Sequence, residues 1–173
     1  EERGGFFFTG DGQNELFIRQ KEIYDGAMPS GNSIAAENLY LLGRISENSA
    51  WEAYSTQLGH AFSTQVERAP RGFTALLQTL QMQVRGSSEI VIAGNAMELQ
   101  DALGVLRKHY DPFKLLLFRP NEGSAAIEAI AGFLAFQKAI DDGLTVYICQ
   151  NYACQQPQTD LHELDRYLAN PDL

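Results

Sequence analysis

The sequence predicts an α+β fold in two parts, residues 1–86 and residues 87–173. In the first part, apolar residues recur at helical spacing after an aromatic, glycine-rich start. In the second part, short apolar runs alternate with helix-like segments. A polar break at Gly86, Ser87 and Ser88 separates the two patterns. With 173 residues, 45% of them hydrophobic, the chain is long enough to bury a substantial core.

The first part is expected to begin with a β-hairpin and to continue with about three helices. Aromatic residues at 6–8 and apolar residues at 16–18 flank Gly10-Asp11-Gly12, which is typical of two short strands around a turn. Pro70 should separate the second helix from the third, and Ser49 with Glu52 has capping-box spacing. The helical apolar positions are Ala35, Leu39, Leu42 and Ile45, then Trp51, Tyr54, Leu58, Phe62 and Val66, then Phe73, Leu76, Leu77, Leu80 and Val84.

The second part is expected to form a small three-stranded parallel α/β unit. Its apolar runs at 89–93, 115–118 and 145–149 are continuous, as in strands that are buried on both faces. Helix-like segments follow them near 96–109, 124–140 and 160–169, which indicates βαβ units. Asp160 with Glu163 three residues later marks the start of the last helix.

Composition excludes several classes of partner. The chain has 22 acidic and 13 basic residues, a net charge of −9, and no basic cluster longer than Arg107-Lys108-His109, so nucleic acid is not expected. No apolar run approaches the roughly 20 residues of a membrane span, so no membrane is expected either. Two cysteines do not make a disulfide scaffold, and the expected compartment is the cytoplasm. Because the first residue is Glu1, we expect the chain to be a piece of something longer.

The loop at 21–33 is the strongest candidate site. Asp25-Gly26 supplies a turn, and Ser30 or Asn32 can cap the helix that follows. Side-chain oxygens and free backbone N–H groups gathered at a positive helix end suit a polar or anionic ligand. In the structural alternative, Asp25 only organises its turn, Ser30 or Asn32 only caps, and Lys21 is a solvated charge.

Three phrases of the sequence resemble a known family. They are G-G-F-F at 4–7, Y-D-G-A-M-P-S-G-N-S at 24–33, and Y-I-C-Q-N-Y-A-C at 147–154 with Pro157. They resemble the C-terminal region of thioredoxin-domain-containing proteins, the spermatogenesis-associated thioredoxin-like family. The resemblance implies an upstream thioredoxin-like domain, followed by an α/α toroid similar to six-hairpin glycosidases and N-acylglucosamine 2-epimerases. Residues 1–86 would then be the last helices of that toroid.

The resemblance implies roles for the residues of the 21–33 loop, which would lie on the toroid rim. Asp25 would act as a general base or hold a sugar hydroxyl, and Lys21 would pair with it or with an anionic substrate. Ser30 and Asn32 would orient a carbohydrate-like small molecule by hydrogen bonds. The sequence does not decide whether the protein is an enzyme. The alternative function is a noncatalytic scaffold that positions the upstream thioredoxin-like domain for redox clients.

Other candidate groups carry weaker signals. Cys149 and Cys154 have four intervening residues, unlike the two of a thioredoxin motif, so they are either a resolving redox pair or two packed thiols. The sequence implies no cofactor and no metal site, because a zinc site needs about four ligands and only His162 lies near the cysteines. A single glycine, Gly94, is weak evidence for an anion-binding turn. Phe6, Phe7, Phe8 and Phe17 could line a sugar site, although packing against helices is the commoner use of such residues.

Overall fold

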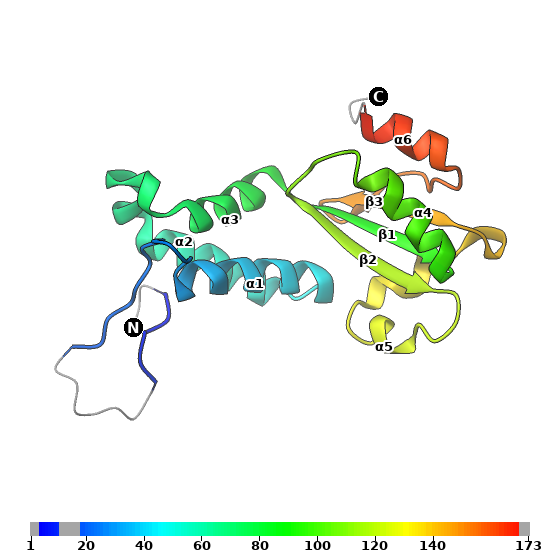
Figure 1. Ribbon diagram of the computed structural model, residues 1–173. Helices are drawn as coiled ribbons and strands as arrows, with labels where there is room; N and C mark the ends of the chain where they lie inside the picture. Colours follow the sequence, from blue (N-terminus) through cyan, green and yellow to red (C-terminus); the bar gives the residue numbers. More distant parts are fainter. Residues whose placement is uncertain (1–3, 11–17, 170–173) are drawn as a thin grey trace. The chain divides into compact units, whose positions relative to one another are not determined.

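The structure is a computed structural model that describes residues 4–10 and 18–169. The chain forms two compact units, Glu1–Arg85 and Gly86–Leu173 (Figure 1). The first unit is helical and the second contains a four-stranded mixed sheet with helices, so the α+β prediction is confirmed. In the described residues, no helix combines the length and the apolar character needed to cross a membrane.

The described residues of the first unit form three α-helices, as predicted. They are α1 (Gly31–Ser46), α2 (Ser49–Arg68) and α3 (Thr74–Arg85), with a short 3₁₀ turn at Pro70–Gly72 between α2 and α3. Proline fits the start of this turn because its missing N–H would have no partner there. The buried core of the unit consists of Ile23, Ala36, Leu58, Phe62, Val66, Phe73 and Leu76.

Two details of the predicted helices are wrong. Asn48, and not Ser49, is the N-cap of α2, since its side chain accepts hydrogen bonds from the backbone N–H groups of Ala50 and Trp51. The predicted buried face of α2 is buried only from Leu58 onward. Several large apolar side chains on these helices face solvent instead, namely Ile34, Leu42, Trp51, Tyr54 and Val84.

The predicted hairpin is not a hairpin in the described residues. Phe6, Phe7 and Phe8 form no strand, and of the second expected strand Leu16 and Phe17 lie outside the described residues. A backbone hydrogen bond of 2.8 Å from Phe8 N to Gln20 O joins the two segments in which the strands were expected. The physical reason is that the backbone N–H and C=O of Phe6 are hydrogen bonded to the side chain of Asn32 in α1 and not to a partner strand.

The sheet of the second unit has the order β2-β1-β3-β4. Its strands are β1 (Ser88–Gly94), β2 (Lys114–Pro120), β3 (Thr145–Gln150) and β4 (Ala153–Cys154). Strands β1 and β2 are parallel and are connected through α4 (Ala96–Leu106), as the βαβ prediction requires. Strand β3 pairs antiparallel with β1, so the prediction of an all-parallel sheet is wrong.

The segment between β2 and β3 explains that difference. The helix predicted at 124–140 is absent. The segment instead contains the four-residue α5 (Ala125–Glu128) and two short 3₁₀ helices, Gly132–Phe136 and Ile140–Asp142. Its buried residues Ala131, Leu134 and Gln137 are three apart, a spacing that suits the three residues per turn of a 3₁₀ helix. Such a segment does not carry the chain back along the sheet, so β3 starts at the end where β2 finishes and runs antiparallel.

Two layers cover the sheet. Helices α4 and α6 (Leu161–Ala169) pack on the face that carries Ile90, Ile92 and Val146 (Figure 1). The opposite face is covered by the segment between β2 and β3. There, Thr145 Oγ1 accepts a hydrogen bond from Ile140 N at 2.8 Å. As predicted, Asp160 caps α6, because its carboxylate accepts the N–H groups of His162 and Glu163 at 2.8 and 2.9 Å.

Candidate functional site

Asp25, the predicted general base, is buried and surrounded by backbone N–H groups. Its Oδ1 accepts from Ser30 N at 2.8 Å, and its Oδ2 accepts from Ala75 N and Leu76 N at 2.9 and 3.3 Å. Its own backbone N–H donates to Gly72 O at 2.8 Å. Asp25 therefore caps the start of α3 and closes the turn before α1 at the same time. This geometry supports an organising role for the carboxylate.

Ser30 caps α1. Its backbone is extended, with φ −69° and ψ 155°, and its Oγ accepts a 3.1 Å hydrogen bond from Ser33 N. The two hydroxyl oxygens, Ser30 Oγ and Ser33 Oγ, lie 2.9 Å apart, and both side chains are buried. The hydroxyl of Ser30 is thus engaged within the helix terminus, as expected of a cap residue.

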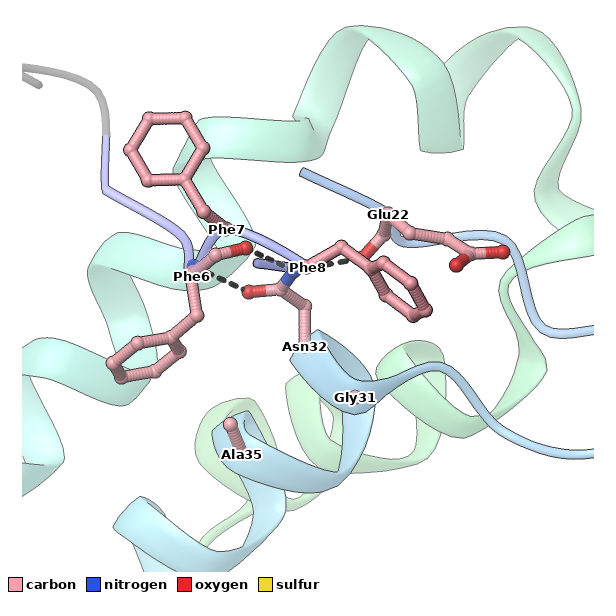
Figure 2. A pocket seen from close by; sticks show the side chains of 7 residues that line it. All are labelled: Phe6, Phe7, Phe8, Glu22, Gly31, Asn32 and Ala35. Atoms are coloured by element: carbon pink, nitrogen blue, oxygen red, sulfur yellow. Dashed lines mark hydrogen bonds between the residues drawn. The ribbon is translucent and has the colours of Figure 1, made fainter. Parts of the chain in front are cut away.

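Asn32, in the first turn of α1, binds two segments of the chain together. Its Oδ1 accepts from Phe6 N at 2.6 Å, and its Nδ2 donates to Phe6 O at 2.9 Å and to Glu22 O at 2.7 Å (Figure 2). The side chain is only 4% exposed. Because the amide uses its acceptor and its donors on backbone groups, it fixes residues 4–10, which we call the N-terminal arm, against α1.

Lys21 is directed to the N-terminal arm and not to Asp25. Its Nζ donates to Gly4 O at 2.6 Å and lies 4.7 Å from the centre of the Phe7 ring. The guanidinium carbon of Arg19 lies 4.2 Å from the centre of the same ring. Both contacts are cation–π interactions, which hold Phe7 close to two positive charges.

Two glycines allow the N-terminal arm to follow this course. Gly4 and Gly5 have φ values of +72° and +80°, a left-handed backbone that favours glycine. A Cβ atom at Gly5 would also lie 2.9 Å from Cζ of Phe62, in the core. The G-G-F-F phrase therefore has a structural explanation: the glycines turn the chain, and the phenylalanines that follow reach the first turn of α1.

A pocket of about 240 Å³ lies where this arm meets the start of α1. We call it the phenylalanine pocket, and it is lined by Phe6, Phe7, Phe8, Glu22, Gly31, Asn32 and Ala35. Figure 2 shows the Phe6 ring beside Ala35 and the Phe8 ring on the side of the Glu22 carboxylate. The Phe6 and Phe8 rings are 55% and 77% exposed. The pocket thus offers exposed aromatic surface together with one carboxylate at a helix N-terminus.

The sequence prediction found part of this pocket. Of the four residues predicted for the site, only Asn32 lines it, whereas Lys21, Asp25 and Ser30 hold the surrounding backbone in place. Phe6, Phe7 and Phe8 were considered as sugar-site residues, and Phe17 lies outside the described residues. Glu22, Gly31 and Ala35 were not predicted as residues of the site. The available signal was the polar loop beside a G-G-F-F-F run, but bringing the two together requires contacts between distant residues.

The two cysteines lie in the second unit and are joined by a disulfide. Cys149, on β3, is 5% exposed, whereas Cys154, on β4, is exposed and does not pack under the turn. The connecting turn has Asn151 and Tyr152 at φ +50° and +64°, the conformation of a tight type I′ hairpin turn. The side chain of Gln137 approaches both sulfurs, with Nε2 3.3 Å from Cys149 Sγ and 3.2 Å from Cys154 Sγ.

The remaining candidates have local roles. Asn95 and Glu98 form a capping box at α4, and a Cβ at Gly94 would lie 2.5 Å from Glu98 Oε2, so Gly94 makes room for this cap. His109 Nε2 lies 2.7 Å from Asp165 Oδ1, which joins the turn after α4 to α6 and lowers the pKa of Asp165. No cluster of three or more possible metal ligands occurs within the described ranges.

The chain is similar along nearly its whole length to part of a longer protein known from three mammals. The chain is 32% identical over 170 residues to spermatogenesis-associated protein 20 of Mus musculus, an alignment that covers 96% of this chain and 22% of that protein. The same protein of Rattus norvegicus and of Homo sapiens is 31% and 30% identical over 172 residues, again with 22% of its length covered. No family model and no solved structure matches. The chain therefore spans about a fifth of the length of these curated relatives.

Proposed function

We propose that this chain is the C-terminal region of a thioredoxin-domain-containing protein, and that its phenylalanine pocket binds a carbohydrate-like ligand. The similarity to proteins about five times as long supports the idea of a larger protein. The observation that carries the binding proposal is the pocket itself, with three phenylalanines and Glu22 at the N-terminus of α1.

The chemistry of the pocket suits a small polyhydroxylated molecule. The apolar faces of sugar rings pack on aromatic rings, and the exposed Phe6 and Phe8 rings offer such surfaces. The Glu22 carboxylate can accept hydrogen bonds from hydroxyl groups, and the positive end of α1 attracts their oxygen atoms. At about 240 Å³ the pocket is smaller than most drug-sized ligand sites, which favours a ligand of one sugar unit.

We propose binding, and not acid–base catalysis, as the role of this part of the rim. Both oxygens of the Asp25 carboxylate accept backbone hydrogen bonds, and Lys21 is bound to Gly4. A general base needs an oxygen within reach of the substrate proton. Asp25 and Lys21 are therefore assigned as positioning residues, which hold the loop and the N-terminal arm around the pocket.

Exposed apolar side chains on α1, α2 and α3 support the proposal that these helices belong to a larger helical array. Soluble proteins bury most of their large apolar side chains, and an exposed group of them often marks a contact surface. In the proposed toroid, helices from the rest of the protein would cover these side chains. They are Ile34, Leu42, Trp51, Tyr54 and Val84.

The test is ligand-dependent thermal stabilisation of the intact protein by a panel of monosaccharides and their phosphates. A sugar that binds the native state raises the melting temperature in proportion to the logarithm of its concentration. Phe8→Ala and Glu22→Gln should weaken that binding about three- to tenfold. Glu67→Gln, an exposed carboxylate on α2, is the matched control and should leave binding unchanged. No stabilisation by any sugar would reject the binding proposal.

The second candidate function is the noncatalytic scaffold for the upstream thioredoxin-like domain. The observation that favours it is the engagement of Lys21, Asp25, Ser30 and Asn32 with the protein's own backbone. An intact protein that responds to no sugar, but loses thiol reductase activity toward its clients when Asp25→Ala weakens this unit, would support the scaffold.

A further inference from the structure

We infer that the Cys149–Cys154 pair is a reversible thiol–disulfide exchange site that takes dithiol reductants, with Gln137 as the group that assists the exchange. This inference concerns the second unit and is independent of the phenylalanine pocket. It rests on the unequal burial of the two cysteines and on the contacts of Gln137.

The two cysteines differ in accessibility in the way an exchange site requires. Cys154 lies on the two-residue strand β4 after a tight turn and is exposed, whereas Cys149 is buried in β3. Exchange begins with a thiolate that approaches one sulfur along the disulfide bond, so access decides which sulfur is attacked. An incoming thiolate can reach Cys154 Sγ, and Cys149 is then the leaving group.

Gln137 contacts both sulfurs and has an unused acceptor. Its Nε2 lies 3.3 Å from Cys149 Sγ and 3.2 Å from Cys154 Sγ, and the residue is 7% exposed. Its Oε1 is buried and has no hydrogen-bond partner among the described residues. A buried acceptor without a donor costs free energy, and a cysteine S–H is a weak donor that is present only after reduction.

The amide of Gln137 can therefore serve both redox states. With the pair oxidised, Nε2 points to the sulfurs, which accept weakly. As the disulfide opens, Nε2 can donate to the thiolate that leaves on Cys149. Once protonated, the thiol can donate to Oε1 after the amide rotates, and rotation about the last side-chain bond is soft.

The reaction balances with a dithiol as the only co-reactant. One thiolate of the dithiol attacks Cys154 Sγ, the Cys149–Cys154 bond breaks, and Cys149 takes up a proton. The second thiol of the reductant then attacks the sulfur of the mixed disulfide that came from the reductant, and the thiol of Cys154 is released. Two electrons and two protons pass from the dithiol to the cysteine pair, and the dithiol becomes a disulfide.

The test is a redox titration of the intact protein, read by isotope-coded alkylation. Both cysteines lie on the tryptic peptide 139–166, so their state is resolved from that of any other cysteine. In buffers of graded reduced and oxidised dithiothreitol, the pair should convert as one two-electron couple while the far-UV circular dichroism stays native. In Cys149→Ser, Cys154 should form a mixed disulfide with glutathione, whereas Cys149 in Cys154→Ser should resist it.

Gln137→Leu tests the assisting group. Loss of its hydrogen bonds to sulfur should slow reduction of the folded protein about tenfold. Gln156→Leu, an exposed glutamine near β4, is the control and should reduce at the parental rate. The exchange proposal is wrong if the disulfide is reduced only when the protein unfolds, or if the two thiols never oxidise in the folded protein. Both outcomes are read from the wild-type protein, so they do not depend on the folding of a variant. An unchanged rate in folded Gln137→Leu would overturn the role of Gln137.

Discussion

The carboxylate of Asp25 accepts a 2.9 Å hydrogen bond from the backbone N–H of Ala75, fifty residues further along the chain. This bond joins the turn before α1 to the first turn of α3. A helix start leaves backbone N–H groups without internal partners, and here a distant carboxylate supplies the acceptor. The 21–33 loop, which is the candidate site in the sequence, thus also connects the start of α1 to the start of α3.

Asp25→Ala should lower the free energy of unfolding by roughly 2 to 4 kcal/mol, because three backbone N–H groups lose a charged acceptor. Urea denaturation followed by circular dichroism measures the loss. The control Glu67→Ala removes an exposed carboxylate from α2 and should change stability by less than about 0.5 kcal/mol. A stable Asp25→Ala variant would show that the carboxylate does not organise this unit.

Asn32→Asp should release the N-terminal arm. The new carboxylate would face the carbonyl oxygens of Phe6 and Glu22 without a donor for either, at a cost of roughly 2 to 4 kcal/mol. Hydrogen exchange read by mass spectrometry should therefore show faster exchange in residues 4–10. Asn38→Asp makes the same substitution at an exposed position of α1 and should leave that exchange unchanged. Equal protection in both variants would contradict the bridging role of Asn32.

Asp165 should make the second unit sensitive to acid. The hydrogen bond from His109 is the largest cause that lowers the pKa of Asp165 below its usual value of 3.8. A carboxylate with a lowered pKa in the folded state stabilises the fold above the unfolded pKa, and that stabilisation is lost as the pH falls through the folded pKa.

The measurement is the melting temperature of Asp165→Asn and the parent between pH 2 and pH 7. The variant should melt lower at pH 7, and the gap should close as the pH falls through the lowered pKa of Asp165, because the parent carboxyl is then protonated as well. Asp101→Asn, an exposed position on α4, should show no such convergence. A gap that stays constant at every pH would contradict a contribution from the ionised carboxylate.

Asn95→Ala should lower the free energy of unfolding by about 1 kcal/mol, because the N–H groups of Met97 and Glu98 lose their acceptor. Chemical denaturation measures it, and Gln100→Ala on the exposed side of α4 is the comparison. If both variants unfold alike, the capping box adds nothing to stability.

Local signals in the sequence predicted local structure well. Pro70 between helices, Ser30 before α1 and Asp160 before α6 all act as predicted, because a cap or a break is decided by neighbouring residues. The prediction of a helix at 124–140 was wrong. The apolar residues of this segment fit a helix in composition, but the buried ones are three residues apart, as in a 3₁₀ helix. The direction of β3 could not be read locally either, since it depends on where the preceding segment delivers the chain.

The candidate site was predicted only in part, for a related reason. The sequence shows that four polar residues lie close together, but three of them have distant partners. Those three are Lys21, Asp25 and Asn32. Asn32 bonds to Phe6 and Asp25 bonds to Ala75, so only the folded chain separates residues that hold the loop from residues that line the pocket. Glu22 lies within the predicted loop, yet its place in the pocket depends on the N-terminal arm.

The central proposal is that the phenylalanine pocket binds a carbohydrate-like ligand. The most direct measurement is a titration of the isotope-labelled intact protein with monosaccharides, followed by two-dimensional ¹H–¹⁵N NMR. We predict saturable shifts that cluster at residues 5–8, at Glu22 and at 31–35, and that are strongly reduced in Phe8→Ala. Spectra that do not change with any sugar, or shifts that cluster away from this pocket, would contradict the account.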